Sequence, residues 1–168
     1  MKTKQISPIG LSVTGAGPKI FKPVFMILVI GIISEIFFSS FTKIPFVKID
    51  LTTAGWIWAI CGAILWICAI VQFSMGFPKG KLITSGVYSL SRNPIYASWI
   101  VFILPGVAAI CNNWIFLVAS FTMYLSLTIN IKEEEKALAE TFGEQYRKYS
   151  ERVSRVLSFP HFYDYPEI

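Results

Sequence analysis

Two polar segments of this chain carry side chains that could together bind a charged organic molecule. The first, LITSGVYSLSRNPIY, covers residues 82–96 and holds one arginine and two tyrosines. The second follows a long apolar run and opens with adjacent carboxylates, Glu134 and Glu135. Exposed N–H groups at a helix start beside Arg92 can hold an anion, and the carboxylates can hold a cation such as an amino group. With the flat faces of the two tyrosines, the set suits a ligand with a carboxylate, an ammonium and a flat ring.

The composition indicates that these segments belong to a membrane protein. The chain has 168 residues, of which 54% are hydrophobic and 15% are charged, and its mean hydropathy is +0.59. A soluble domain of this size could not hide so much apolar surface, so lipid is the expected solvent for much of the chain. The net charge of +5 fits a membrane surface and not a nucleic acid, because the basic residues flank the apolar runs instead of forming a separate domain.

Four apolar runs are long enough to cross a bilayer as helices, the expected form because backbone groups in lipid must be paired within their own segment. The runs cover residues 23–42, 54–75, 94–111 and 114–131. The first lacks a small-residue cleavage site, so we interpret it as a retained helix and not as a signal peptide. Only two asparagines separate the last two runs, which predicts a tight helical hairpin.

The tail after the fourth run combines many charges with apolar residues at helical spacing. We expect the fourth span to continue as an amphipathic helix up to Gly143. A second short helix that carries Tyr146 should then lie along the membrane interface.

The expected fold class is therefore an all-α integral membrane protein. It should have about four transmembrane helices, with a tight hairpin of spans three and four and a cytoplasmic amphipathic C-terminal helix. We expect residues 1–168 to form a single membrane domain. Within it, residues 23–75 should supply the first two spans.

Metal chemistry gets little support from the sequence. The three cysteines, Cys61, Cys68 and Cys111, lie in or beside apolar runs and form no CxxC motif, so we interpret them as buried small hydrophobic residues. The single histidine, His161, lies near the C-terminus. One histidine without a thiolate cluster makes a zinc site improbable, and we expect no metal.

Taken together, the two polar segments resemble the isoprenylcysteine carboxyl methyltransferase and phospholipid methyltransferase superfamily. Its signature is similar to L-V-T-S-G-x-Y, then R-H-P-x-Y, then, after a helical hairpin, E-E-x-x-L-x-x-x-F-G-x-x-Y-x-x-Y. Here these motifs fall at residues 82–88, 92–96 and 134–149. Each motif alone is a weak signal, whereas the ordered set with a two-span hairpin between its halves is a strong one. The resemblance covers residues 81–155.

This resemblance implies an integral membrane enzyme that uses S-adenosyl-L-methionine, with residues 76–160 as the cofactor-binding catalytic core. It also implies the cofactor contacts, to which the charge argument above adds Arg92. The expected contacts are Lys81, Leu82, Ile83, Tyr88, Arg92, Asn93, Pro94, Ile95, Tyr96 and Glu134. Asn93 stands where the family usually has histidine, and an asparagine can donate a hydrogen bond but cannot titrate near neutral pH.

We expect methyl transfer to a lipophilic, membrane-embedded acceptor, either a phospholipid amine or an isoprenylcysteine-like carboxylate. The protein then mainly has to align the nucleophile and exclude water, because the methyl donor is already activated. An amine acceptor would need a base, for which Glu135 and Tyr146 are the candidates.

Two residues are candidate substrate contacts. Asn130 stands where the resemblance implies an arginine that holds a substrate carboxylate, and Glu35 is an ionisable residue inside the first apolar run. The alternative for Glu35 is that it reaches water or pairs with a helix neighbour.

Two further classes of protein stay open on the sequence. A non-enzymatic membrane scaffold or small transporter would bind no cofactor and would leave both polar segments unexplained. A reductase with a related membrane core would use a nicotinamide cofactor, and the complete E-E-x-x-L-x-x-x-F-G set argues against it.

The distribution of basic residues predicts a multi-pass topology with both termini in the cytoplasm. Thirteen of the fifteen lysines and arginines lie in the N-terminal head, in residues 76–93 or in the tail, and only Lys43 and Lys48 lie between the first two runs. A cysteine in place of Ser85 should therefore react with an impermeant thiol reagent from the cytoplasmic side alone, and one in place of Thr53 from the other side. Labelling of position 85 from outside alone would contradict this topology.

Overall fold

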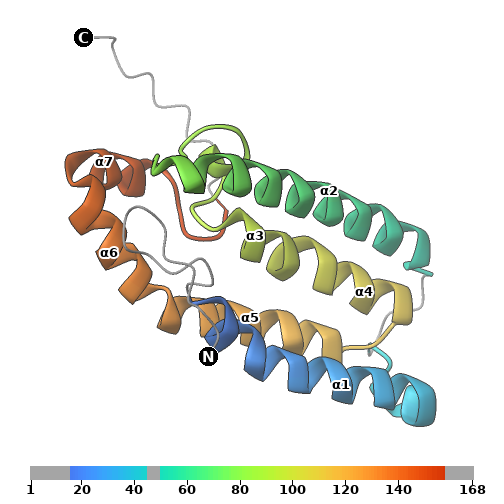
Figure 1. Ribbon diagram of the computed structural model, residues 1–168. Coiled ribbons are helices and arrows are strands. Elements are labelled where there is room, and N and C mark those ends of the chain that lie inside the picture. Colours follow the sequence, from blue (N-terminus) through green and yellow to red (C-terminus); the bar gives the residue numbers. More distant parts are fainter. Residues whose placement is uncertain (1–15, 45–49, 158–168) are drawn as a thin grey trace.

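The computed structural model describes residues 16–44 and 50–157, and every regular element in these ranges is a helix (Figure 1). The longer helices are α1 (Gly17–Thr42), α2 (Thr52–Gly76), α4 (Leu104–Cys111), α5 (Ile115–Asn130), α6 (Lys132–Phe142) and α7 (Glu144–Arg152). The shorter elements are the 3-10 turns η1 (Phe77–Lys79) and η2 (Gly86–Ser89), the helix α3 (Pro94–Ala97) and the π-helical turn η3 (Ser98–Ile103). His161, Lys2, Lys4 and Lys48 lie outside the described residues.

The predicted spans are present as long apolar helices. α1, α2 and the continuous stretch Pro94–Cys111 are each long and apolar enough to cross a membrane, and α5 with α6 forms a fourth candidate that bends by 45°. α1 begins at Gly17, earlier than the predicted residue 23, because Pro18 occupies its first turn, where a missing N–H costs no hydrogen bond. The bend between α5 and α6 falls at Ile131, so the tail turns away from the last span instead of extending it straight.

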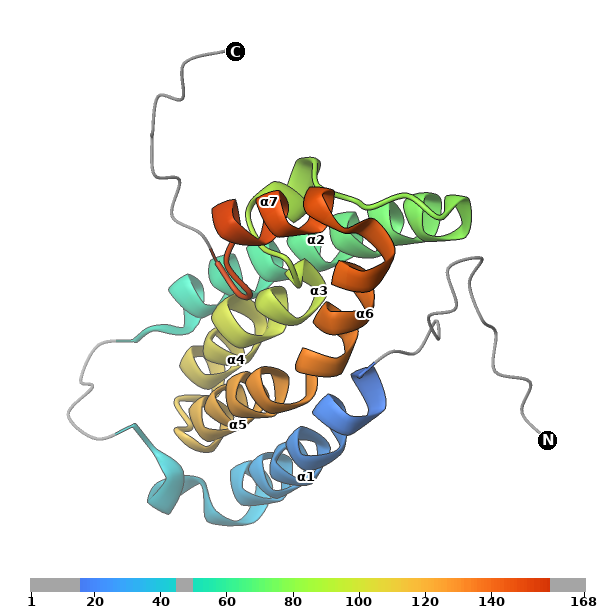
Figure 2. The same cartoon turned by 90° about the vertical axis from the view of Figure 1, so that its left-hand side faces the viewer.

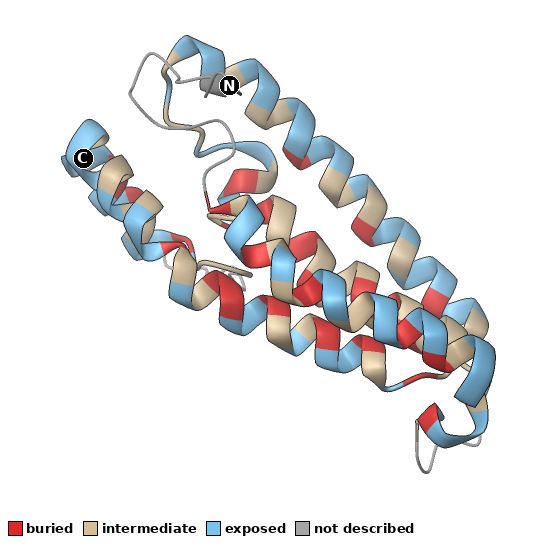
Figure 3. Ribbon diagram, turned by 60° about the horizontal axis from the view of Figure 1, so that its bottom comes forward, coloured by how far each residue is buried: buried red, intermediate tan, exposed pale blue. Residues whose placement is uncertain are grey.

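The four long helical stretches pack in the order α1, α5, α4, α2, with the predicted hairpin in the middle (Figure 2). Side chains of α1, α4 and α5 form the main core, which includes Ile20, Val24, Leu104, Met123 and Leu127. The outer helices stay largely exposed (Figure 3): 17% of the most apolar part of α2 is buried, against 39% of Pro94–Cys111. The prediction that Cys61 and Cys68 are buried is wrong, because both lie on this exposed surface, where lipid suits a small apolar side chain.

The asparagine turn between α4 and α5 ties the hairpin to α1. Asn112 adopts the left-handed conformation with a φ of 50°, which asparagine tolerates, and the Asn113 side chain accepts the first N–H of α5 at 3.0 Å. The Asn113 amide also donates to the Ser34 hydroxyl at 3.2 Å and to the Glu35 carboxylate at 2.9 Å. This buried asparagine gives Glu35 a partner at the end of the bundle opposite to α6 and α7 (Figure 1).

Glycines let α2 and α4 pack with their backbones in contact. A Cβ atom on Gly55 would lie 2.8 Å from the Gly106 carbonyl oxygen, and one on Gly106 would lie 2.8 Å from the Ala59 nitrogen. A Cβ atom on Gly62 would lie 2.6 Å from the Phe102 Cβ. Such small residues allow the close packing that holds helices together in lipid, where burial of apolar surface gives no driving force.

Gly62→Leu should therefore destabilise the bundle, because the added side chain would force α2 away from η3. We expect a loss of roughly 1–3 kcal/mol, measured as a lower thermal unfolding midpoint of the purified protein in detergent. Cys61→Leu is the matched control, since the neighbouring residue is exposed. Equal midpoints for the two variants would show that this close contact does not hold the helices together.

Candidate functional site

The link 82–96 is held against α2 at its glycine turn. Gly86 has a φ of +62°, which favours glycine, and a Cβ atom there would collide with the Gln72 side-chain nitrogen. The Gln72 side-chain oxygen accepts a hydrogen bond from the Val87 N–H at 3.2 Å. Gln72, a polar residue near the end of an apolar helix, thus fixes the turn that starts η2.

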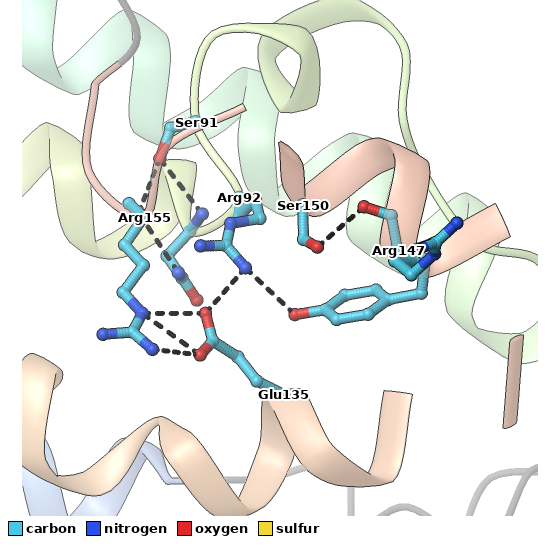
Figure 4. Close-up of polar contacts among 8 residues, drawn as sticks. Ser91, Arg92, Glu135, Arg147, Ser150 and Arg155 are labelled. Carbon is cyan, nitrogen blue, oxygen red and sulfur yellow. Dashed lines mark hydrogen bonds and ion pairs between the residues drawn. The ribbon is translucent and has the colours of Figure 1, made fainter. Parts of the chain in front are cut away.

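A second set of contacts joins the link to the chain that follows α7 (Figure 4). The Arg92 backbone N–H donates to the Ser154 carbonyl oxygen at 2.9 Å. The Arg155 carbonyl oxygen accepts hydrogen bonds from the Ser91 hydroxyl and from the Asn93 side-chain amide, both at 3.1 Å. Three consecutive residues of the link therefore bind two consecutive residues of what we call the tail segment, residues 153–157.

Glu135 lies between two arginines at this junction (Figure 4). Its Oε1 is 3.0 Å from the Arg92 Nη1, and the Arg155 guanidinium makes a two-nitrogen contact, with Nη2 2.6 Å from Oε2 and Nε 3.0 Å from Oε1. The side chains of Arg92 and Glu135 are 15% and 14% exposed, against 35% for Arg155. The contact with Arg92 is therefore the better shielded from water, whereas the contact with Arg155 is shorter and uses two nitrogens.

Three tyrosines pack beside the junction. The Tyr149 hydroxyl donates to the Tyr88 carbonyl oxygen at 2.7 Å, and the Tyr146 hydroxyl accepts a hydrogen bond from the Arg92 Nη1 at 3.3 Å. Burial raises the pKa of all three phenols above the usual value, so they stay protonated at neutral pH. Tyr146 is therefore better suited to hydrogen bonding than to accepting a proton as a base.

Glu134 makes contacts of a different kind, at the start of α1. Its Oε2 accepts a hydrogen bond from the Ala16 N–H at 3.2 Å, and a Cβ atom on the adjacent Gly17 would lie 3.3 Å from the Tyr96 hydroxyl. Burial raises the pKa of Glu134, the hydrogen bond from Ala16 lowers it, and the neighbouring carboxylate raises it further. The charge of Glu134 also acts on Tyr88 and Tyr96, so these three side chains share one partly dry environment.

Most of the predicted cofactor contacts come together at this end of the bundle. The buried and half-buried ones are Leu82, Ile83, Tyr88, Arg92, Asn93, Pro94, Ile95, Tyr96 and Glu134. Lys81 is exposed. Leu82 packs against the tyrosines of α7, and Pro94 occupies the first turn of α3 as predicted.

The two predicted substrate contacts lie far apart. Asn130 is one turn before Glu134, and its amide donates to the Ser126 carbonyl oxygen at 2.8 Å. The Ser126 hydroxyl donates in turn to the Lys19 carbonyl oxygen at 3.3 Å, so this part of α5 faces the start of α1. Glu35 pairs with the asparagine turn at the other end of the bundle. The structure thus places Asn130 near the candidate site and Glu35 away from it.

Two residues of the site have only weak signals in the sequence. Gln72 is a lone amide in an apolar run, and polar residues in such positions deserve a functional hypothesis. Arg155 is one of many charges in the tail. Its contact with Glu135 forms only when α6 and α7 fold back on each other, and no spacing rule predicts that.

The arrangement leaves hydrogen-bonding groups available for a ligand. The Arg92 Nε is buried without a partner among the described residues, and it can donate to an anion such as a carboxylate. Glu134 can accept from an ammonium or a hydroxyl, and Tyr88 and Tyr96 offer flat apolar faces. These groups fit a ligand with a carboxylate, an amino group and a flat ring. In residues 16–44 and 50–157, no group of three or more His, Cys, Asp or Glu side chains could hold a metal ion.

A family profile and several curated proteins match parts of this chain. A profile of the family described as phospholipid methyltransferase matches residues 52–145, more than half of the chain. The protein-S-isoprenylcysteine O-methyltransferase of Xenopus laevis is 29% identical over 118 residues, which cover 65% of this chain and 41% of that protein. The enzyme of the same name from Mus musculus is 35% identical over 78 residues, which cover 46% and 28%. Protein-S-isoprenylcysteine O-methyltransferase B of Arabidopsis thaliana is 29% identical over 79 residues, which cover 47% and 40%. The chain spans less than half the length of these curated relatives.

Removing the charge of Glu135 should loosen the tail. Glu135→Gln leaves Arg92 and Arg155 without their counter-ion, and we expect the local stability to fall by roughly 1–3 kcal/mol, limited by the partial exposure of Arg155. Amide hydrogen exchange should accelerate across α7 and the tail segment and stay unchanged in α2. Glu140→Gln is the control on the same helix, because its pair with Lys136 is exposed. Exchange as slow in Glu135→Gln as in the control would show that the ion pairs do not hold the tail.

Proposed function

This chain belongs to the phospholipid methyltransferase family, and from that premise we propose that it transfers a methyl group from S-adenosyl-L-methionine to a lipid-like acceptor. The observation that carries this proposal is the position of Glu134. It is a half-buried carboxylate at the polar end of an apolar helical bundle, close to Tyr88, Tyr96 and the start of α1. A glutamate that served only as a surface charge would be exposed to water and would not lie among these groups.

The residues of the candidate site fit the polar parts of this methyl donor. We propose that Glu134 accepts hydrogen bonds from its amino or hydroxyl groups, and that Arg92 Nε binds its carboxylate. Tyr88 and Tyr96 would provide flat surfaces for its ring system. When bound, S-adenosyl-L-methionine supplies a methyl group on a cationic sulfur, which departs as a neutral thioether when the acceptor attacks in line.

We propose a positioning role for Glu135 and hydrogen bonding for Tyr146, the two residues predicted as candidate bases. Both carboxylate oxygens of Glu135 are occupied by arginines, and the Tyr146 phenol stays protonated because burial raises its pKa. Asn93 would have a structural role: its side-chain amide donates a hydrogen bond to the Arg155 carbonyl oxygen, and this contact needs no titrating group.

For the acceptor, we propose a lipid-like molecule with an ionised oxygen nucleophile such as a carboxylate. A carboxylate is already deprotonated at neutral pH, whereas an ammonium must first lose a proton to a base, and Glu135 is not free to accept one. The names of the relatives point to the same chemistry. A phospholipid amine is the second candidate, because Asn130 offers no positive charge to a substrate carboxylate.

We further propose that the site opens on the cytoplasmic side. Residues 76–93 and the chain after α5 carry most of the described basic residues, and both lie at the same end of the bundle (Figure 1). The donor would then enter from the cytoplasm and the acceptor from the bilayer.

Glu134→Gln should weaken binding of S-adenosyl-L-methionine to the purified protein, because it keeps the shape of the side chain and removes the charge. A charged hydrogen bond in a partly dry site contributes roughly 1.5–3 kcal/mol, so calorimetric titration should show a loss of about ten- to a hundredfold in affinity. The affinity of the unmodified protein should also fall on acidification, starting at a pH above that of an ordinary glutamate, because the pKa of Glu134 is raised. Glu134→Gln should lose this dependence.

The control is again Glu140→Gln, whose exposed side chain should leave the affinity unchanged. With methyl-labelled donor and a total lipid extract, the unmodified protein and the control should place label in the organic phase. If both variants bound S-adenosyl-L-methionine with near-normal affinity, Glu134 would have no role in binding this donor. Donor binding without label transfer to any lipid would overturn the proposed acceptor class.

A further inference from the structure

One buried hydrogen-bond donor in the membrane-spanning part of the protein has no partner. Among the described residues, the buried side-chain nitrogen and oxygen atoms that lack a hydrogen bond are Arg92 Nε, assigned above to the methyl donor, and Trp99 Nε1. Unpaired buried donors are uncommon, and the interior of a bilayer holds no water to satisfy them. Trp58 shows the usual outcome, since its indole N–H donates to the Val101 carbonyl oxygen at 2.7 Å.

The π-helical turn η3 sets the position of Trp99. Trp99 is the second residue of this turn, which is wider than an α-helical turn and therefore redirects its side chains. The Ile100 carbonyl oxygen accepts a hydrogen bond from the Ser120 hydroxyl of α5 at 2.6 Å, and the Val101 carbonyl oxygen accepts the one from Trp58 of α2. Hydrogen bonds from α2 and α5 thus fix the backbone of η3, and this backbone sets the direction of the Trp99 side chain.

The Trp99 ring belongs to an aromatic cluster that consists of Phe21, Trp66, Tyr96 and Trp99. Trp99 meets Phe21 of α1 and Trp66 of α2 edge to face, with ring centroids 6.0 and 6.3 Å apart, and Phe21 also contacts Tyr96 at 5.9 Å. The Tyr96 hydroxyl lies beside Gly17, next to the residue that donates to Glu134. The cluster therefore extends from the candidate donor site about one helical turn into the apolar part of the bundle.

We propose that the Trp99 indole N–H binds an oxygen atom in the head of the methyl acceptor, so that the aromatic cluster holds this head beneath the methyl donor. The proposal rests on the proposed function and deepens it. An indole N–H can only donate, so it selects an oxygen acceptor and gives no hydrogen bond to an ammonium group. Asn130 is uncharged and cannot form an ion pair with a substrate carboxylate. The Trp99 N–H would instead bind an oxygen of the substrate through a hydrogen bond.

Two lipid classes carry such an oxygen next to an apolar chain. One is an S-prenylated cysteine with a free carboxylate, and the other is a diacyl phospholipid with ester carbonyl groups. Either lipid would place its polar head at the aromatic cluster and its apolar chain among the lipid-exposed side chains of the bundle. Measuring the effect of a Trp99 variant on each lipid therefore identifies the source of the oxygen.

The test replaces Trp99 by phenylalanine, which keeps an aromatic ring and removes the N–H. We expect the KM for the acceptor to rise about five- to tenfold, with kcat and the affinity for S-adenosyl-L-methionine within about twofold of the unmodified protein. An increase for the S-prenylated cysteine alone assigns the oxygen to a carboxylate, and an increase for phosphatidylethanolamine alone assigns it to an ester. Trp56→Phe is the control, because Trp56 is exposed and lies outside the cluster.

An unchanged KM for both acceptors, or an equal change in Trp56→Phe, would overturn the proposal and leave the Trp99 N–H to a trapped water. The indole N–H resonance of Trp99, identified by its loss in Trp99→Phe, gives a readout that needs no turnover. It should shift when the S-prenylated cysteine or phosphatidylethanolamine is added in nanodiscs, and no shift with either would overturn the proposal. Absence of donor binding and of turnover, with that shift present, would instead refute the proposed function.

Discussion

The polar end of this protein depends on one carboxylate held between two guanidinium groups. Glu135 lies on α6, Arg92 at the end of the link and Arg155 in the tail segment, so the ion pairs join three stretches that are far apart in the sequence. Each charge is partly withdrawn from water, and each therefore needs the others. With the charges in place, the hydrogen bonds from residues 91–93 to the backbone carbonyl oxygens of the tail segment can form, and α7 is held over the link.

This interaction also separates the roles of two adjacent glutamates. Neighbouring residues on a helix point about 100° apart, so Glu135 can face the arginines while Glu134 faces the start of α1 and the two tyrosines of the link. Burial raises the pKa of Glu134, and only one hydrogen bond, from Ala16, offsets that cost within the described chain. A carboxylate in this state is suited to a cationic or hydroxyl-bearing ligand, whereas its neighbour is already satisfied by the protein.

The membrane imposes a matching rule on the rest of the bundle, because polar groups in lipid must find partners within the protein. Asn113 satisfies Ser34 and Glu35, and Ser120 and Trp58 bind the carbonyl groups of η3. Burial of apolar surface does not drive helices together in lipid, so close packing must do so. Glycines on α2 and α4 allow that packing, because they let the two backbones come into contact. The Trp99 N–H is the exception among these groups, because no described residue accepts its hydrogen bond. An oxygen atom of the substrate would supply the missing acceptor.

The sequence by itself determined the helical class, the spans, the tight asparagine turn and the stop at Gly143, because apolar run length and turn chemistry are local properties. It also suggested Arg92 as a group that can hold an anion, and Glu134 and Glu135 as carboxylates that can hold a cation. Only the tertiary structure decided that Arg155 returns to Glu135, that Gln72 holds the Gly86 turn and that Glu35 serves the far end of the bundle. Those contacts join residues far apart in the chain, and they depend on how α6 and α7 fold back and on which helix faces meet, neither of which a local pattern encodes.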